Sequence, residues 1–246
     1  MIRPCILVPV FNHADGVARL VPALKELGLP TFLVNDGSDQ SCTCLLRDLA
    51  AAEPWITLLE RGENGGKGAA VKTGLRAAQR RGYSHALQLD ADGQHDLADA
   101  PRLLALAEAN PEAVISGAPD YRNAPWLRFY GRYLTHVWVW INTLSLEISD
   151  SMCGYRVYPL AATARVIQSA HTGDRMDFDP EILVRLHWAG LRVIQVRTPV
   201  TYPPDGVSHF RAFRDNVLIS WAHTRLFFGM LYRLPQLLRR KWNAHV

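Results

Sequence analysis

Two aspartates spaced two residues apart end an apolar run in the middle of the chain, His85-Ala-Leu-Gln-Leu-Asp90-Ala-Asp92-Gly-Gln94-His95. Residues i and i+2 of a strand point the same way, so Asp90 and Asp92 can reach one point if the strand frays after its apolar part. Hard oxygen ligands suit Mg²⁺ or Mn²⁺, which in enzymes often rest on one or two carboxylates plus substrate phosphates. Gln94 can add a third oxygen. A metal site is one interpretation of this run; a plain turn made by aspartates is the other.

The elements that must position these residues follow from hydrophobic periodicity. Short apolar runs predict strands at 5–10, 31–35, 55–59, 113–116 and in the run that ends at Asp90. Helical spacing predicts helices at 16–27, 43–52, 97–109 and from the glycine-rich loop to about 81. Strands that alternate with helices indicate an α/β fold with a parallel sheet covered on both faces.

Polar turns follow three of these strands, at Asn12, Asp36 and Asp90. In parallel sheets ligands bind at the carboxyl ends of the strands, so these three turns are expected to lie together. The turn 36–39 can also cap the next helix. The loop 61–70, Arg-Gly-Glu-Asn-Gly-Gly-Lys-Gly-Ala-Ala, follows a fourth strand and can bring backbone close to a nucleotide at a helix N-terminus, or can be an ordinary loop. This convergence favours the metal site over a plain turn.

Three better-known ligand motifs do not fit. A phosphate-binding P-loop would need glycine in place of Arg61 and serine or threonine in place of Gly68. The dinucleotide fingerprint would need glycine or alanine in place of Val71. A calcium loop would need glycine in place of His95 and glutamate in place of Pro101. An ATPase, a nicotinamide enzyme and an EF-hand protein are therefore disfavoured.

Bulk composition is that of a globular protein. The chain has 246 residues, 48% of them hydrophobic and 20% charged, which fits one large domain or two small ones. The net charge of +4 favours anionic partners without naming one. Four cysteines lack disulfide or zinc spacing, so we expect free thiols in a reducing compartment. The N-terminus does not resemble a signal peptide, and the apolar stretches are too short to span a bilayer.

Six motifs together resemble family 2 glycosyltransferases, in particular the dolichol-phosphate mannosyltransferase-like branch. In chain order they are Val-Pro-Val-Phe-Asn at 8–12, Val-Asn-Asp-Gly-Ser-Asp at 34–39, Asn-Gly-Gly-Lys-Gly at 64–68, the DXD segment Asp-Ala-Asp-Gly-Gln-His at 90–95, Asp-Ser-Met-Cys-Gly-Tyr-Arg at 150–156 and Phe-Asp-Pro-Glu-Ile-Leu at 178–183. The resemblance spans about residues 4 to 210, and its specificity comes from order and spacing rather than from any one motif.

The resemblance implies a GT-A fold, a nucleotide-sugar donor, Mg²⁺ or Mn²⁺ as cofactor, and an inverting single-displacement transfer. The donor-binding residues that it implies are Pro9, Asn12, Asp36, Lys67, Gly68, Asp90 and Asp92. Within that set, Asp92 would bind the metal, with Asp90 and Gln94 beside it. A metal at this point would neutralise the leaving diphosphate as the sugar bond breaks.

This chain departs from the branch at three places. His13 stands where the branch usually has glutamate, which leaves the base of the nucleotide open between UDP and GDP. Ser-Gly-Ala-Pro at 116–119 stands where the branch usually has Gly-Ser-Arg, so a contact expected for a phosphate acceptor is missing. Gly93 replaces a usual leucine, a smaller difference.

Two segments are rich in aromatic and basic residues, at 126–141 and 210–242. Such segments suit a membrane interface, where rings lie at the headgroup level and arginines reach phosphates. The alternatives are a helix packed on the sheet, an oligomer contact or a solvated tail. We expect a GT-A domain at 1–209 and an amphipathic C-terminal helical segment at 210–246. The expected partners are a nucleotide-sugar donor, a lipid or lipid-linked acceptor and a membrane surface, with no nucleic acid; an oligomer is left open.

The acceptor decides what catalysis requires. A phosphate acceptor is already ionised, whereas a hydroxyl needs a carboxylate to take its proton. Asp150 is the candidate base, although it can instead only brace the turn that follows it. Arg156 is the second candidate catalytic residue and could bind acceptor or diphosphate charge. Arg128, Arg132 and His209 are the further candidates for acceptor binding, the last in a loop at 203–210 that could close over the substrates.

The function expected from the sequence is transfer of a hexose from UDP or GDP to a lipid or lipid-linked acceptor, at the cytoplasmic face of a membrane. A sugar-1-phosphate nucleotidyltransferase is the rival enzyme, but residues 9–20 lack its Gly- and Arg-rich loop. An inactive protein that only binds nucleotide sugars is the non-enzyme rival. The intact aspartates argue against it.

Overall fold

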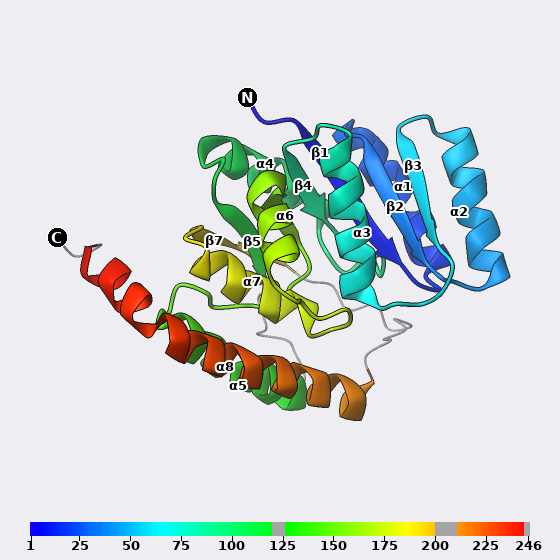
Figure 1. Ribbon diagram of the computed structural model, residues 1–246. Helices are drawn as coiled ribbons and strands as arrows, with labels where there is room; N and C mark the ends of the chain where they lie inside the picture. Colours follow the sequence, from blue (N-terminus) through cyan, green and yellow to red (C-terminus); the bar gives the residue numbers. More distant parts are fainter. Residues whose placement is uncertain (120–125, 200–210, 244–246) are drawn as a thin grey trace.

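The structure is a computed structural model that describes residues 1–119, 126–199 and 211–243, without the side chains at 126–132, 212 and 243 (Figure 1). Its first half alternates strands and helices. The elements are β1 (Pro4–Val10), α1 (Ala14–Leu27), β2 (Thr31–Asp36), α2 (Gln40–Ala52), β3 (Ile56–Arg61), α3 (Lys67–Arg80), β4 (His85–Gln88), the short 3₁₀ helix η1 (Leu97–Asp99), α4 (Ala100–Ala109) and β5 (Val114–Pro119). Every strand and helix predicted for this half is present, with ends shifted by a few residues.

Polar side chains account for some of these ends. The Asp39 carboxylate accepts a hydrogen bond from the Cys42 N–H at 2.9 Å, so α2 begins at Gln40, three residues before the predicted start. Asp96 accepts from the Ala98 N–H at 2.9 Å and caps η1. The four cysteines are free thiols, also as expected.

The second half contains four elements that the sequence did not predict, in addition to its two long helices. The helix α5 (Trp126–Thr143) is followed by β6 (Arg156–Pro159), α6 (Leu160–Ser169), α7 (Phe178–Trp188), β7 (Val193–Thr198) and α8 (Ala212–Asn243). Arg156, which the sequence placed in a turn, is the first residue of strand β6. As a strand residue, Arg156 is held by its neighbours on both sides, Gln88 of β4 and Ser116 of β5.

The seven strands form one sheet in the order β3-β2-β1-β4-β6-β5-β7. All neighbouring pairs are parallel except those of β6, which runs antiparallel to β4 and β5. The sheet is thus mostly parallel, as predicted. Because β6 is reversed, its first residue pairs with Gln88 at the carboxyl end of β4 and with Ser116 of β5.

Helices cover both faces of the sheet (Figure 1). One apolar core joins α3, α6 and α7 to the strands, and it extends to α5 and α8. The other joins α1, α2 and α4 to the opposite face. Packing of this kind explains why the central strand β1 is apolar on both sides.

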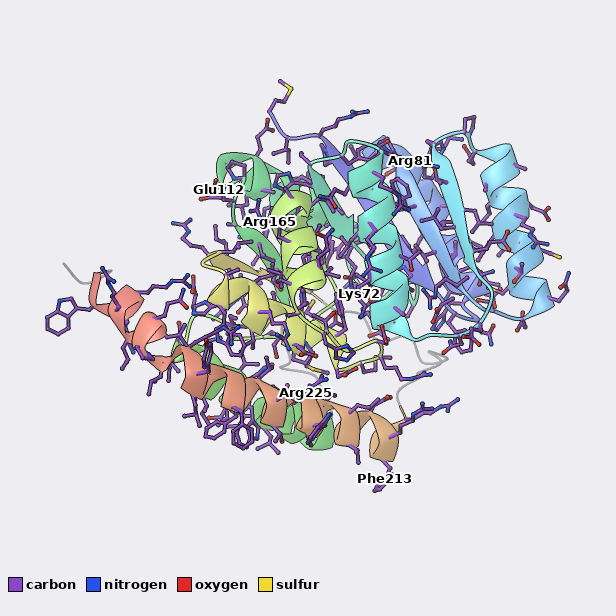
Figure 2. All side chains as sticks on the ribbon, viewed as in Figure 1. Lys72, Arg81, Glu112, Arg165, Phe213 and Arg225 are labelled. Atoms are coloured by element: carbon purple, nitrogen blue, oxygen red, sulfur yellow. The ribbon has the colours of Figure 1, made fainter. Side chains whose placement is uncertain are left out.

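The helices α5 and α8 lie side by side beneath α7, below the body of the molecule (Figure 1). The outer side of α8 exposes large apolar side chains: Phe213, Val217, Trp221, Phe228, Leu231, Tyr232, Leu238 and Trp242. Phe213 is 86% exposed and extends away from the body (Figure 2). None of the helices in the described ranges is long and apolar enough to cross a membrane.

The basic residues near the end of α8 have partners inside the protein. Arg240 donates to the Trp188 carbonyl at 2.7 Å, and the Arg233 guanidinium lies 4.8 Å from the centre of the Trp188 ring. Lys241 donates to the Leu144 carbonyl at 3.4 Å. Arg240 and Arg233 therefore fasten α8 to the end of α7, and Lys241 fastens it to the residue after α5; cations are favoured at such helix ends by the exposed carbonyls.

Candidate active site

The polar turns predicted from the sequence meet at one edge of the sheet. Because β1, β2 and β4 are parallel neighbours, their carboxyl ends place Asn12, Asp36 and Asp90 along the same edge. Pro9 lies in β1 opposite Val34 of β2, close to this edge. The reversed strand β6 brings the segment that precedes it to the edge as well.

Asn12 ties the first two strand ends together. Its N–H donates to the Ser38 hydroxyl at 3.0 Å, and its side-chain oxygen accepts from the Asp39 N–H at 2.8 Å. Asn12 has a φ of 51°, which is unusual for a residue other than glycine. Backbone held in such a conformation clusters at ligand sites, where the surrounding contacts maintain it.

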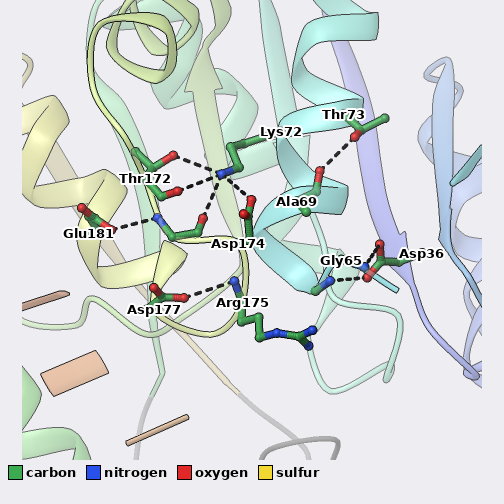
Figure 3. Close-up of polar contacts among 12 residues, drawn as sticks. Asp36, Gly65, Ala69, Lys72, Thr73, Thr172, Asp174, Arg175, Asp177 and Glu181 are labelled. Atoms are coloured by element: carbon green, nitrogen blue, oxygen red, sulfur yellow. Dashed lines mark hydrogen bonds and ion pairs between the residues drawn. The ribbon is translucent and has the colours of Figure 1, made fainter. Parts of the chain in front are cut away.

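Asp36 organises the glycine-rich loop. Its carboxylate accepts hydrogen bonds from the Gly65 N–H at 3.1 Å and the Gly66 N–H at 2.7 Å (Figure 3), and from Arg61 Nε at 2.7 Å. Burial raises the pKa of Asp36, while the two backbone N–H groups and Arg61 lower it, with a net rise. The end of β2 and the start of α3 are thereby fixed relative to each other.

Four charged side chains of alternating sign run inward from the edge. Lys67 Nζ lies 2.8 Å from Asp90 Oδ1 and 2.8 Å from Asp179 Oδ2, and Asp179 Oδ1 lies 3.7 Å from Arg156 Nη1. Burial alone would lower the pKa of Lys67, but the two carboxylates raise it above its usual value. Burial alone would raise the pKa of Asp90, but Lys67 and His95 hold it well below its usual range. Lys67 is therefore a fixed cation between two carboxylates.

Gly154 lies against this row of charges. A Cβ atom at this position would stand 2.5 Å from both Asp90 carboxylate oxygens and 2.6 Å from Lys67 Nζ. Any side chain would have to displace the Lys67–Asp90 pair. The glycine of the 150–156 motif is thus required by close approach to two other motifs of the sequence.

The DXD segment leaves β4 in a turn. The Asp92 carboxylate accepts from the Gln94 N–H at 3.0 Å, and His95 Nε2 lies 3.4 Å from Asp90 Oδ2. The His95 ring stacks on Tyr155, with centroids 5.1 Å apart. His95 is therefore fixed beside Asp90 by a second motif.

The donor set of this segment fits a hard divalent cation. Two carboxylates and a side-chain amide offer only oxygen ligands. Burial raises the pKa of Asp92, and the neighbouring charge of Asp90 raises it further. A cation between the two would offset that repulsion. In the described ranges no three His, Cys, Asp or Glu side chains form a ready-made metal cage, so most of the coordination would come from substrate and water.

Asp150 braces the turn that follows it. Its Oδ1 accepts from the Met152 and Cys153 N–H groups, both at 2.8 Å. Its other oxygen, Oδ2, lies 3.8 Å from His136 Nε2 of α5. Asp150 is buried, so one of its oxygens has a structural role while the other faces a titratable side chain.

Arg156 is completely buried, with 0% of its surface exposed. Its guanidinium donates to the Asp179 carbonyl at 2.8 Å, the Ser151 carbonyl at 2.6 Å and the Tyr158 hydroxyl at 3.2 Å. These contacts join β6 to the segment after Asp150 and to α7. In this arrangement Arg156 reaches substrate only through its neighbours.

The loop 171–177 and the first turn of α7 carry residues to which sequence reasoning gave no role. Lys72 of α3 donates to the Thr172 and Gly173 carbonyls, both at 3.0 Å, and lies 2.7 Å from Asp174 Oδ1 (Figure 3). Asp179 completes the row of charges described above. The motif at 178–183 was the available signal, but its partners are distant in sequence.

Of the remaining predicted site residues, the structure places Gly68 but not the candidates for acceptor binding. Gly68 packs against the same loop, because a Cβ there would stand 2.8 Å from the Gly173 carbonyl oxygen. The side chains of Arg128 and Arg132, together with His209 and the loop 203–210, lie outside the described residues. Their predicted part in acceptor binding stays a prediction.

The family model for glycosyl transferase family 2 matches residues 5–166 of this chain. A polyprenol monophosphomannose synthase of Mycolicibacterium smegmatis is 27% identical over 221 residues, covering 84% of this chain and 80% of that protein. A dolichyl-phosphate beta-glucosyltransferase, ALG5C of Trichomonas vaginalis, is 29% identical over 230 residues, covering 83% of this chain and 65% of that protein.

Solved structures establish the fold class. A mannosyltransferase from Pyrobaculum calidifontis, PcManGT, in complex with GDP-Man and Mn²⁺, superposes with a TM-score of 0.60 at 17% identity, over 99% of this chain and 75% of that one. The likeness confirms the predicted GT-A fold. The mostly parallel seven-stranded sheet flanked by helices agrees with that fold.

Proposed function

The chain belongs to glycosyl transferase family 2 and is a glycosyltransferase. From this premise we propose that it transfers a hexose, with inversion, from a UDP- or GDP-sugar to a lipid phosphate or lipid-linked acceptor. The observation that carries the proposal is the placement of Lys67 between Asp90 and Asp179, beside Asp92 and the glycine-rich loop. A fixed cation and two carboxylates for a metal suit a nucleoside diphosphate, which is both the donor's anchor and the leaving group.

The chain's own residues would prepare the donor for transfer. The loop 64–68, held by Asp36, presents backbone N–H groups at the start of α3, where the helix dipole favours the diphosphate. Lys67 adds charge close to the same place. Asp90, Asp92 and Gln94 would hold Mg²⁺ or Mn²⁺, which when bound supplies Lewis-acid neutralisation of the leaving diphosphate.

A lipid phosphate is the acceptor class that the relatives' names support, since one is named for making polyprenol monophosphomannose and the other for dolichyl phosphate. Such a phosphate is already ionised and needs no strong base. With this acceptor, Asp150 contributes by bracing the turn at 150–154 through Oδ1, and Arg156 contributes by positioning Asp179. With a hydroxyl acceptor, Asp150 Oδ2 would take the proton.

The membrane surface is the proposed location of the reaction, on its cytoplasmic side. The exposed aromatic face of α8 supports contact with a membrane surface, together with Tyr133 and Leu134 on the neighbouring α5. A shallow groove of about 720 Å³ lies along this face of α8, lined by Phe213, Asn216, Val217, Ser220, Trp221 and Thr224. Aromatic side chains of this kind are favoured at the headgroup level of a bilayer.

Transfer of labelled hexose into the organic phase tests the proposal. Purified protein with Mn²⁺ is offered UDP-glucose, UDP-galactose or GDP-mannose, with a short polyprenyl phosphate or the matching polyprenol as acceptor. We expect one donor to be used with the phosphate, and Asp92→Asn or a chelator to lower the rate by about three orders of magnitude. Transfer that is indifferent to both changes, or absent with every donor, would refute it.

The two acceptors separate the roles of Asp150. If the phosphate is used, Asp150→Asn should keep a measurable rate, because an amide oxygen can still accept from the Met152 and Cys153 N–H groups. If only the polyprenol is used, the same variant should abolish transfer.

A further inference from the structure

Glu181 of α7 is a buried carboxylate shared by three parts of the fold. It has 0% exposure, and its two oxygens have different partners. Oε1 accepts from Arg185 of the same helix, through Nε at 3.0 Å and Nη2 at 2.7 Å. Oε2 accepts from Arg225 Nη2 of α8 at 3.0 Å and from the Gly173 N–H of the loop 171–177 at 2.9 Å. A single oxygen thus joins α8 to that loop.

The loop 171–177 in turn holds the start of α3. The Ala69 N–H donates to the Asp174 carbonyl at 2.9 Å, and Lys72 of α3 donates to the Gly173 carbonyl at 3.0 Å (Figure 3). Arg175 Nη1 donates to the Asn64 side chain at 3.3 Å, on the other side of the glycine-rich loop. The loop 171–177 therefore contacts both arms of the segment that the proposed function assigns to the donor.

Charge alone does not require Arg225. Arg185 already neutralises Glu181 with two hydrogen bonds, and the Gly173 N–H gives a third. A second arginine, from the helix α8, adds a charge-assisted hydrogen bond to the oxygen that also accepts from Gly173. Its charge also acts on Asp177 of the same loop. What Arg225 supplies is a fixed position for the Glu181 oxygen that holds Gly173.

We propose that Arg225 and Glu181 are positioning residues for the donor site: α8 fixes one carboxylate oxygen, that oxygen fixes the loop 171–177, and the loop fixes the backbone that takes the nucleoside diphosphate. The proposal rests on the proposed function in placing the donor at the glycine-rich loop. The helix α8 would then both expose its aromatic face and, through Arg225, position the donor site; Arg225 and Phe213 both lie on this helix (Figure 2).

The test compares Arg225→Met with two matched variants. Arg185→Met removes an arginine from the same carboxylate but leaves the link between α8 and the loop. Arg225→Lys keeps a charged donor that can reach Oε2. The readouts are binding of UDP and GDP in the presence of Mn²⁺, the split between KM for the donor and kcat, and amide hydrogen exchange over residues 64–74 and 171–177.

We expect Arg225→Met to weaken nucleotide binding about fivefold to tenfold, the effect of one charge-assisted hydrogen bond, with kcat at saturating donor little changed. Arg185→Met should stay within about twofold of the wild type, and Arg225→Lys should recover most of the loss. Amides of 171–177 and of the start of α3 should exchange faster in Arg225→Met only.

Equal effects of Arg225→Met and Arg185→Met on binding and exchange would overturn the positioning role, as would no effect of either. The exchange measurement keeps this outcome distinct from failure of the proposed function. If the wild-type protein binds neither UDP nor GDP with Mn²⁺, the proposed function fails. Faster exchange in Arg225→Met alone would then still show that the link holds the loop, and unchanged exchange would refute the link itself.

Discussion

At Gly154 the addition of a single methyl group should cost most of the activity. Adding one methyl group at Gly154 would place it 2.5 Å from the Asp90 carboxylate and 2.6 Å from Lys67 Nζ. Because a misplacement of about 1 Å in a site can cost about 100-fold in rate, we expect Gly154→Ala to lose at least that much in sugar transfer.

The matched control for this substitution is Gly62→Ala, whose added methyl group meets no atom within 4 Å. It should retain the wild-type rate. Initial rates with the donor identified for the wild type, together with circular dichroism to verify folding, decide the comparison. A Gly154→Ala enzyme with wild-type kinetics would mean that the Lys67–Asp90 pair is not needed for transfer.

For single residues, the sequence predicted which strand-end side chains meet, but not their partners in the second half of the chain. Asp90, Asp36 and Asn12 could be placed at one edge because each ends an apolar run, and the ends of parallel strands meet. The partner of Lys67 in α7, Asp179, could not be found in this way, because the two are more than one hundred residues apart. For Arg156 the sequence suggested the wrong partner. Its residue type suggested anion binding, whereas the side chain is buried and supports α7 through the Asp179 carbonyl.

Among the helices and strands, those of the first half could be predicted from local sequence patterns, and four of those in the second half could not. The first half was predictable because its strands are continuous apolar runs and its helices are amphipathic. The strand β6 has four residues, all buried, and carries an arginine, so no apolar run marks it. In α7 almost every residue is buried, which leaves little periodicity to detect. The packing of the second half, rather than its local pattern, determines these elements.

The contact between α5 and α8 should depend on pH through His223. This side chain is buried on α8 beside Asn142 and Trp138 of α5, and burial lowers its pKa from 6.5 to about 4. The folded protein therefore keeps His223 neutral at a pH where the unfolded chain binds a proton. The resulting stability is present above pH 6.5 and is lost as the pH falls toward 4, by about 3 kcal/mol.

Urea denaturation at pH 7 and pH 4 measures this effect, with His223→Gln as the control. Other groups also titrate in this range, so the difference between the two proteins isolates His223. The free energy of unfolding should fall more steeply in the wild type, by about 3 kcal/mol over the interval. Parallel pH profiles would show that His223 is not held neutral in the fold.

The whole molecule combines a donor site at one edge of the sheet with an aromatic face on α8. If that face contacts the bilayer, replacing Trp221 and Phe228 by serine should weaken binding to phosphatidylcholine vesicles that contain phosphatidylglycerol. The expected loss is about tenfold to a hundredfold, since each ring contributes buried apolar area. Vesicle sedimentation measures it.

Trp55→Ser is the control for vesicle binding, because Trp55 precedes β3 at the opposite end of the sheet from β7. Trp55 is partly buried against the apolar core, so circular dichroism must first verify that the variant folds; the folded variant should keep wild-type vesicle binding. Equal binding by all three proteins would assign the aromatic face to something other than lipid.

Thermal unfolding with a panel of UDP-, GDP- and dTDP-sugars, each with and without Mn²⁺, tests the central claim most directly. A ligand that binds only the folded protein must raise the unfolding temperature. We predict that one nucleotide raises it only when Mn²⁺ is present, and that Asp92→Asn abolishes the rise while its unliganded Tm stays close to that of the wild type. No rise with any nucleotide sugar, or an equal rise in Asp92→Asn, would contradict a metal-dependent donor site at Asp90 and Asp92.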